Sequence, residues 1–452
     1  MGGPVRTIEE HRDAVRALVA PVLPGASAPA GASVPPGVSV VSVASDGASP
    51  SVLEARRVDD LAADTGAGHG YRVLGRAVGS PIPLPPFDNS QMDGFAVRAA
   101  DAGATLRVVA PVAAGAVPPP LPVGAAAPIM TGARIPDGAD AVFPVEQTSA
   151  GSFPAALSLA SVLVPADVEV GTFVRATGSD LAAGAPVVQA GAVLTPAVLG
   201  ALAAAGVAEV GLVRRPRVLV VSTGSELAGA DGAVADAAGG SGAGAGASGA
   251  GINDANGIAL RAALAEVGVE SRAVRVPDDE ARFLAALDGA VGGWADLVLT
   301  TGGISAGAYE VVRQALEPRG LVVSPVAMQP GGPQALGTVE LAGRPVPVVA
   351  FPGNPVSALV SFEVFLRPVL AAAAGMPAER PTRVLPVATA ATSPEGKHQV
   401  RRGRVDDGLV HFVGGPSSHL LAHYADATHL VHLPVGTASV TPGDPLTVWS
   451  LR

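Results

Sequence analysis

The stretch RPRVLVVSTGSEL, residues 215–227, places a short apolar run directly before a turn of Ser, Thr and Gly. A run of this kind is typical of a central strand in a parallel sheet. The chain then continues with an expected helix over 256–268, a strand over 269–279, a helix over 280–293, a strand with a glycine loop over 295–307, and a helix over 310–320. Alternating strands and helices of this length predict right-handed βαβ units on a parallel sheet.

Ligands of an open parallel sheet bind outside the carboxyl ends of the strands. Three loops are expected at that edge: STGSEL at 222–227, PDDE at 277–280 and TTGGISAG at 300–307. The glycines of the third loop allow backbone N–H groups to form an anion-binding nest. The alternative is that these glycines only turn the chain. No G-x-x-x-x-G-K-[ST] motif occurs in the sequence, which excludes an ordinary P-loop NTPase.

The flanking segments have a different texture. A helix is expected over 7–22, where Thr7 and Glu10 have capping-box spacing. A second helix is expected over 52–66 and a third over 194–210, and 72–177 has the short, proline-broken strands of a β domain. A Pro and Gly turn followed by a long apolar helix is expected over 351–375, and the pieces after about 376 alternate like strands of a small β domain. Loops are expected over 23–50 and 228–251.

Composition limits the class of protein. At 452 residues, 48% apolar and 15% charged, the chain predicts a folded protein of two to four domains. No secretory signal and no continuous apolar run of about 18 residues is seen, so we expect a cytoplasmic protein that does not enter the membrane. The formal net charge is −10 and Lys397 is the only lysine, which argues against nucleic-acid binding. With no cysteine, the chemistry must use oxygen and nitrogen groups.

Acidic residues follow the predicted strands. Glu226, Asp278 and Glu310 lie on or just beyond the three loops, and such hard oxygen ligands suit a Mg²⁺ that bridges protein and phosphate. The alternative is that they only cap helices, since Asp278 and Asp279 open the helix that follows. Six of the eight histidines lie between His398 and His432 without an H-E-x-x-H motif, which favours packing or surface roles.

A second acidic cluster precedes a predicted strand. PPFDNSQMDGFAV, residues 85–97, contains Asp88, Asn89 and Asp93 within six positions, a group that we expect to be too exposed for a core.

Several motifs together resemble the MoeA family of molybdopterin molybdenumtransferases, which includes the gephyrin E domain. The motifs are FDNSQMDGFAVR at 87–98, IMTGARIPDGADAV at 129–142, RATGSDL at 175–181, VVSTGSEL at 220–227, TTGGISAG at 300–307 and FPGNPVSA at 351–358. The resemblance implies that molybdate is inserted into adenylyl-molybdopterin, with Mg²⁺-dependent release of AMP, to give the molybdenum cofactor. It also implies a molybdopterin adenylyltransferase as the upstream partner.

The same resemblance implies a multidomain α/β fold. Its parts would be an elongated N-terminal domain of 1–79 and 178–213, an inserted β domain of 80–177, a doubly wound molybdopterin-binding domain of 214–375, and a C-terminal β domain of 376–452. Family members are homodimers whose site lies between the doubly wound domain of one chain and the inserted domain of the other. That arrangement would explain the exposed cluster around Asp93, which would complete a site across the interface.

The family's functional positions map onto this sequence by motif. Positions linked to activity are Asp93, Thr131, Asp180, Glu226, Asp278 and Glu310, of which Glu226, Asp278 and Glu310 are the candidate metal ligands. Positions linked to the pterin, its phosphate and molybdate are Thr223, Gly224, Thr301, Gly302, Gly303, Ser305, Gly307, Asn354, Pro355, Ser357, Arg402 and Ser418.

Departures from the family pattern leave alternatives open. Glu310 stands where an aspartate is common, and Pro325, Gln329 and Gly332 stand where lysines are common. Fewer cations should weaken the binding of a phosphate and of molybdate unless arginines such as Arg401 or Arg402 replace them. The alternative functions are therefore a pterin- or nucleotide-binding paralogue with weakened molybdate transfer, and a gephyrin-like scaffold.

Overall fold

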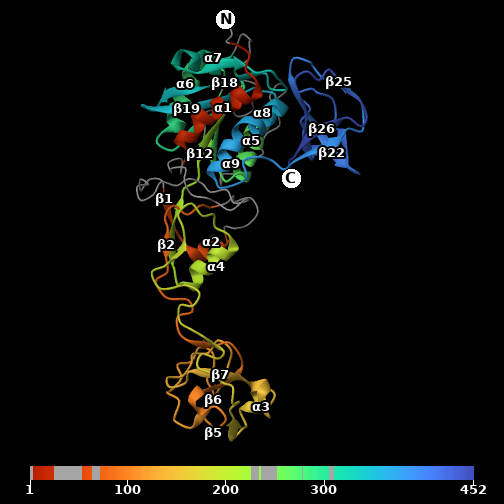
Figure 1. Cartoon of the computed structure of the whole chain (residues 1–452). Helices are drawn as coiled ribbons and strands as arrows, with labels where there is room; N and C mark the ends of the chain where they lie inside the picture. The colour runs from red at the N-terminus through yellow and green to blue at the C-terminus, as the bar shows by residue number, and fades with distance from the viewer. Residues whose placement is uncertain are drawn as a thin grey trace.

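The computed structural model describes residues 4–24, 53–63, 72–224, 234–235, 252–276, 278–304 and 310–452. It is an elongated molecule, with an α/β domain at one end, a C-terminal β domain beside it, a middle domain below, and a distal β domain at the far end (Figure 1). The predicted loops at 23–50 and 228–251 fall almost entirely outside the described residues.

The α/β domain is built on a seven-stranded sheet of order β13-β14-β12-β15-β19-β18-β16. The four strands from β14 to β19 are parallel, and β13, β18 and β16 add antiparallel edges. The strands are β12 (Arg217–Thr223), β13 (Val234–Ala235), β14 (Glu270–Val276), β15 (Leu297–Thr301), β16 (Val322–Pro325), β18 (Pro333–Leu341) and β19 (Arg344–Phe351). The parallel sheet predicted from residues 215–320 is confirmed.

Helices cover both faces of this sheet, because each parallel strand is apolar on both sides. One core joins the sheet to α1 (Ile8–Val19), α5 (Ala255–Glu266), α8 (Pro355–Ser361), the π-helical turn Phe362–Leu366 and α9 (Arg367–Ala373). The other core joins it to α6 (Glu280–Val291) and α7 (Val311–Leu316). The fold is thus a doubly wound sheet between two helical layers.

Helix α1 differs from the predicted domain assignment, which placed residues 1–79 in the elongated domain. The capping box of Thr7 and Glu10 is present as predicted. The apolar face of the helix, with Ile8, Val15 and Val19, is nevertheless buried in the core of the α/β domain. Residues before the helix also pair with that domain, since the Arg6 N–H donates to Pro325 O at 2.9 Å.

The middle domain pairs strands that are far apart in sequence. Strand β1 (Leu53–Arg57) is antiparallel to β11 (Glu209–Val213), and β2 (Val78–Gly79) is antiparallel to β10 (Pro186–Val188). Helices α2 (Val58–Ala63) and α4 (Pro196–Ala204) complete its core. The helix predicted over 52–66 is therefore wrong in its first half, because residues 53–57 obtain their backbone hydrogen bonds from β11. The helix predicted over 194–210 is confirmed, with Thr195 as N-cap.

The distal β domain is a five-stranded sheet of order β7-β4-β6-β5-β8 with a separate β3·β9 pair. A β domain with short strands was predicted for this region from the sequence. Its elements are β3 (Asn89–Ser90), β4 (Gly94–Val97), β5 (Thr105–Val108), β6 (Ala125–Ile129), β7 (Ala141–Pro144), α3 (Phe153–Ala156), β8 (Ser161–Leu163) and β9 (Val174–Arg175).

The C-terminal β domain takes one strand from the α/β domain's own segment. Strand β17 (Met328–Gln329) pairs in parallel with β22, so the sheet order is β17-β22-β24-β26-β20, with β23 alongside β22. The remaining elements are β20 (Thr382–Pro386), β21 (Ala391–Thr392), β22 (His398–Asp406), β23 (Leu409–Phe412), α10 (Leu421–Asp426), β24 (His429–Leu433), β25 (Ser439–Val440) and β26 (Pro445–Ser450). Apart from the position of α1, the boundaries proposed for the four domains stay predictions.

One helical run in the described chain, Pro355–Ala373, is long and apolar enough to span a membrane. It is 83% buried within the protein, where it forms part of the core shared with α1 and α5. Its hydropathy is accounted for by that core position.

The buried His11 of α1 gives the fold a testable response to acid. The ring is fully buried, contacts Phe365 edge-on at 4.6 Å between centroids, and has no hydrogen-bond partner at either nitrogen. Burial, with a smaller effect of the Arg6 charge, lowers the pKa of His11 to about 4. The neutral ring is therefore favoured in the folded state, and its contribution to stability is present above pH 6.5 and lost as the pH falls toward 4.

Between pH 7 and pH 5, protonation of His11 should lower the free energy of unfolding of the wild type by about 2 kcal/mol. We expect His11→Phe to abolish this part of the pH dependence. Urea unfolding at both pH values measures this difference. His411→Phe, at an exposed position, is the control and should leave the pH dependence unchanged. An equal pH dependence in wild type and His11→Phe would contradict the assignment.

Candidate functional site

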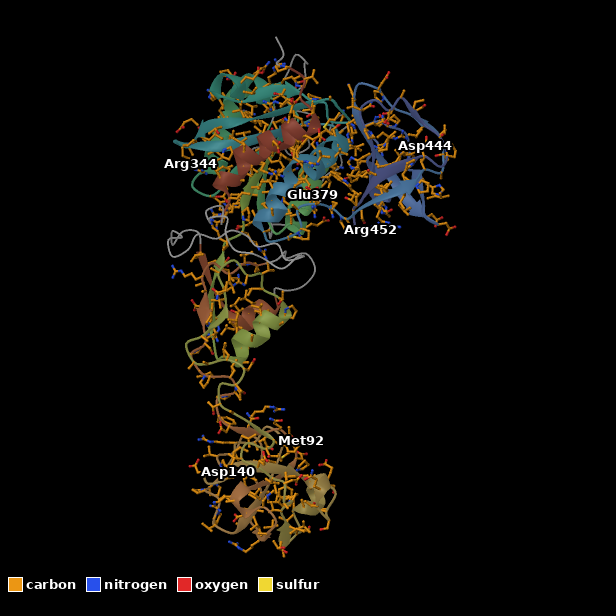
Figure 2. The ribbon with its side chains drawn as sticks, viewed as in Figure 1. Met92, Asp140, Arg344, Glu379, Asp444 and Arg452 are labelled. Carbon is orange, nitrogen blue, oxygen red and sulfur yellow. The ribbon has the colours of Figure 1, made fainter. Side chains whose placement is uncertain are left out.

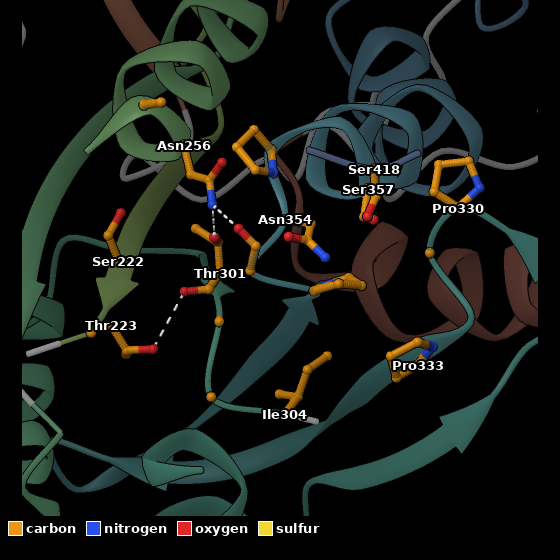
Figure 3. Close-up of a pocket in the computed structure, with 18 of the residues that line it drawn as sticks. Ser222, Thr223, Asn256, Thr301, Ile304, Pro330, Pro333, Asn354, Ser357 and Ser418 are labelled. Atoms are coloured by element: carbon orange, nitrogen blue, oxygen red, sulfur yellow. Dashed lines mark hydrogen bonds between the residues drawn. The ribbon is translucent and has the colours of Figure 1, made fainter. Parts of the chain in front are cut away.

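A pocket of about 870 Å³ lies at the carboxyl ends of the parallel strands (Figure 3). The strand order brings the segments after β14, β12, β15 and β19 to one edge of the sheet. Two further segments close the pocket: the 329–333 loop that begins in β17, and the 416–418 loop of the C-terminal β domain. The site therefore draws on two domains of the same chain.

Many of the predicted site residues line this pocket. They are Thr223, Gly224, Asp278, Thr301, Gly302, Gly303, Glu310, Asn354, Pro355, Ser357 and Ser418. Glu226, Ser305 and Gly307 lie outside the described residues. The three predicted loops thus meet at one edge, as parallel strands require.

The turn after β15 needs its glycines for conformation and for space. Gly302 and Gly303 have φ values of +87° and +67°, in the region that residues with a side chain seldom adopt. A Cβ on Gly302 would lie 3.0 Å from Thr223 Oγ1, and one on Gly353 would lie 3.2 Å from Gly302 Cα. The ends of β12, β15 and β19 can approach this closely only with glycine at those positions.

Asn256, at the start of α5, connects two of these turns and was not predicted. Its Nδ2 donates to Thr301 Oγ1 and to Gly353 O, both at 2.7 Å (Figure 3). The preceding Asp254 caps α5 by accepting from Gly257 N at 2.7 Å, and it also accepts from Ser222 Oγ at 3.0 Å. The sequence signal that could have identified Asn256 was a helix-capping Asp followed by an Asn, directly after the predicted 228–251 loop.

Carboxylates line the pocket from three segments, of which one follows β14, one follows β15 and one contacts the end of β12. Asp254 contacts the end of β12, Asp278 follows β14, and Glu310 precedes α7. No three His, Asp or Glu side chains of the described residues converge as a metal-binding group. Mg²⁺ commonly uses only one or two carboxylates together with substrate phosphates and water, so Asp278 and Glu310 fit this ion by the chemistry of their donors.

The opposite side carries hydroxyl and amide groups. Ser357 and Ser418 lie next to each other there, with Pro330 beyond them on the same side (Figure 3), and Gln329 also lines the pocket. Arg402, predicted to contact substrate, is not among the lining residues. It is 2% exposed and its guanidinium donates to Val413 O, Gly415 O and Ser417 O. Arg402 thus holds the loop that presents Ser418.

Asp93, Thr131 and Asp180 lie away from the pocket within one chain. Asp93 precedes β4 in the distal domain, whose labelled Met92 lies far from the α/β domain that contains β12 (Figures 1 and 2). Its Oδ1 accepts from Thr131 N at 2.6 Å and from Thr131 Oγ1 at 2.8 Å. Asp180 is exposed where the distal and middle domains join, and its N–H donates to Leu84 O. A single chain does not assemble all the predicted residues.

Two neighbours of Asp93 differ in their environment. The carboxylate of Asp88 accepts from the N–H and hydroxyl of Thr177, both at 2.7 Å, and these bonds lower its pKa. Asp88 is exposed, as expected of this cluster, but Asn89 is only 6% exposed and its side chain donates to Phe87 O at 3.2 Å. The expectation that the whole cluster is exposed is wrong for Asn89, whose amide stabilises the turn.

The histidines of 398–432 pack against protein groups. His398 Nε2 and His432 Nδ1 are 3.0 Å apart, and the His432 ring packs at a tilt of 46° against Trp449, with 4.1 Å between the ring centroids. His419 Nδ1 is 2.8 Å from Ser417 Oγ. This agrees with the packing interpretation.

Similarity to known proteins decides the family. Residues 51–206 match the MoeA N-terminal region (domain I and II), and residues 219–372 match the probable molybdopterin binding domain. A molybdopterin molybdenumtransferase 2 of Mycobacterium tuberculosis is 43% identical over 404 residues, which cover 84% of this chain and 92% of that protein. The chain belongs to the MoeA family.

Other members support this assignment. The molybdopterin molybdenumtransferase of Synechococcus elongatus is 34% identical over 396 residues, covering 84% of this chain and 92% of that protein. The crystal structure of a MoeA protein from Pyrococcus horikoshii has a TM-score of 0.71 at 26% identity and covers 99% of this chain and all of that chain. Both the resemblance inferred from the motifs and the multidomain α/β fold of the MoeA family are confirmed.

Asn256→Asp tests the link between the two turns. The substitution keeps the shape of the side chain but replaces the donors to Thr301 Oγ1 and Gly353 O with a carboxylate oxygen. We expect the free energy of unfolding to fall by about 1–3 kcal/mol. Chemical denaturation measures the change. Asn253→Asp makes the same charge change at an exposed lining position and should have little effect, whereas equal effects of the two substitutions would contradict the role of Asn256.

Proposed function

We propose that this chain is a molybdopterin molybdenumtransferase, which transfers molybdate to adenylyl-molybdopterin and releases AMP. The observation that carries the proposal is the 43% identity to an enzyme of that name over 84% of this chain. A large pocket with glycine turns at the strand ends is consistent with a phosphorylated, planar substrate.

The proposed chemistry needs no covalent intermediate with the protein. Backbone N–H groups of the turn after β15 would bind the pterin phosphate, as in other glycine-rich anion sites. Ser357 and Ser418 would hold molybdate on the far side of the pocket, close to where the dithiolene reacts. Together these contacts would orient the two substrates so that the anhydride breaks where molybdate is held.

Asp278 and Glu310, together with Glu226, would hold Mg²⁺. When bound, this ion would supply positive charge to the phosphoanhydride as it breaks.

We further propose that two copies of the chain form the complete site. Asp93, Thr131 and Asp180 belong to surfaces that one chain keeps away from its own pocket. In a two-fold dimer, the distal domain of one protomer would reach the pocket of its partner. The enzyme is proposed to act in the cytoplasm on the product of a molybdopterin adenylyltransferase.

The purified chain should release AMP from adenylyl-molybdopterin when molybdate and Mg²⁺ are both present. Asp278→Asn should lower this rate on the order of 100-fold, because it removes a charge that holds the ion. Asp279→Asn is the matched control, since Asp279 only caps α6 and asparagine caps equally well. Full AMP release by Asp278→Asn would refute the metal role, and no release by the wild type would refute the function.

Mixing two inactive variants tests the shared site. Asp93→Ala and Asp278→Ala chains, unfolded together and refolded, should recover about a quarter of wild-type AMP release, because half of the dimers are mixed and each contains one intact site. Each variant refolded alone is the control. A mixture as inactive as its components would count against a site built from two chains.

A second candidate is a pterin- or nucleotide-binding paralogue with weakened molybdate transfer. It is favoured by one observation: no Arg or Lys of the described residues lines the pocket. The molybdate dependence of AMP release separates the two, because the paralogue would bind the nucleotide and give no molybdate-dependent product.

A further inference from the structure

The two sides of the pocket differ in charge and in hydrogen-bonding character. Asp254 and Asp278 lie on the side of β12 and β14, and the third lining carboxylate, Glu310, lies where α7 begins after β15. The side beyond β19 carries Ser357, Ser417, Ser418 and Gln329, all uncharged. Because like charges repel, an oxyanion in this pocket is expected on the side beyond β19.

Positive charge lies behind this uncharged wall. The guanidinium of Arg401 donates to Gly414 O at 3.0 Å and stacks over Phe412, and that of Arg402 donates to Ser417 O at 3.0 Å. Both residues are less than a tenth exposed, and neither lines the pocket. The positive charge of these arginines favours an anion on this side of the pocket. The groups that can contact the anion directly are the uncharged donors that line the pocket.

Gln329 is the uncharged donor with a fixed orientation. The parallel pairing of β17 with β22 sets Gln329 directly beside Gln399. The Nε2 of Gln399, which is 1% exposed, donates to Gln329 Oε1 at 2.6 Å. Because the amide is planar, holding its oxygen toward β22 directs its two N–H groups the other way. Within the described residues, this Nε2 has no acceptor.

We propose that Gln329 binds the oxyanion substrate through its amide N–H groups, with Gln399 as the residue that positions it. This inference rests on the proposed function and assigns part of its substrate specificity. Since Gln399 occupies the amide oxygen, Gln329 offers the substrate donors and no acceptor. Molybdate at neutral pH has only acceptor oxygens, whereas hydrogen phosphate also carries an O–H that needs an acceptor. The pair therefore favours the fully deprotonated dianion.

AMP release by the full-length protein, measured against molybdate concentration, tests the proposal. Gln329→Met should raise the half-saturating molybdate concentration about 10-fold with little change in kcat, since one hydrogen bond to a charged group is lost. Gln329→Glu keeps the hydrogen bond from Gln399. It should raise the half-saturating molybdate concentration further, because a carboxylate oxygen would face the anion. Gln189→Met, at an exposed position of the middle domain, is the control and should match the wild type.

Gln399→Met tests the positioning role. The freed Gln329 amide can then turn its oxygen to the pocket, so we expect the half-saturating molybdate concentration to rise and inorganic phosphate to become a stronger competitor relative to molybdate. A general loss of structure would not change that ratio. An unchanged ratio in Gln399→Met overturns the positioning role. If Gln399→Met does not fold, Gln329→Glu provides the same test, because its second carboxylate oxygen also presents an acceptor to the pocket. Phosphate should then compete more strongly relative to molybdate, and an unchanged ratio overturns the proposed selectivity.

Failure of this inference can be told from failure of the function. If the wild type releases AMP and Gln329→Met needs no more molybdate, the inference alone is wrong. If the wild type releases no AMP, calorimetric titration of inorganic molybdate into wild type and Gln329→Met still decides. Weaker binding by the variant supports the role of Gln329, and equal binding or none by either protein overturns it.

Discussion

The close approach of three strand ends is the constraint on which the pocket depends. Strands β12, β15 and β19 pair in parallel register, so their carboxyl ends reach the same edge and their turns compete for the same space. Glycine at 302 and 353 lets the backbones meet where a Cβ would press on Thr223 or on the opposite turn. Asn256 then ties these turns with two short hydrogen bonds. The part of the pocket at the strand ends is therefore formed by backbone, and the side-chain amide of Asn256 joins two of its turns.

The walls depend on how other segments attach to the α/β domain. Helix α1 packs against the π-helical turn Phe362–Leu366 and the sheet, while β17 leaves the α/β domain to pair with β22. These contacts fix the C-terminal β domain beside the strand ends. As a result, the 416–418 loop and the 329–333 loop both line the pocket.

Carboxylates and uncharged hydrogen-bonding groups line different parts of the pocket. Asp254 and Asp278 lie on the side of β12 and β14 and Glu310 lies at the start of α7, and a divalent cation and a phosphoanhydride are proposed to meet near these carboxylates. The other side presents hydroxyl and amide donors, with arginines buried behind them. Arg402 does not line the pocket: its guanidinium donates to three carbonyl groups of the 413–417 segment and so holds the loop that carries Ser418, which does line it.

Local patterns in the sequence determined much of this protein. The apolar runs and glycine turns of 215–320 sufficed to predict a parallel sheet and its ligand-binding edge, and Thr7 with Glu10 predicted the start of α1, because these features depend on neighbours within one turn or one strand. Only the tertiary structure decided where α1 packs, why residues 53–57 are a strand, and that Arg402 is bonded to its own loop. Each of these depends on partners more than a hundred residues away or on a loop whose path the sequence does not encode locally. The orientation of Gln329 is of the same kind, since Gln399 lies seventy residues further along the chain and meets it only through the pairing of β17 with β22.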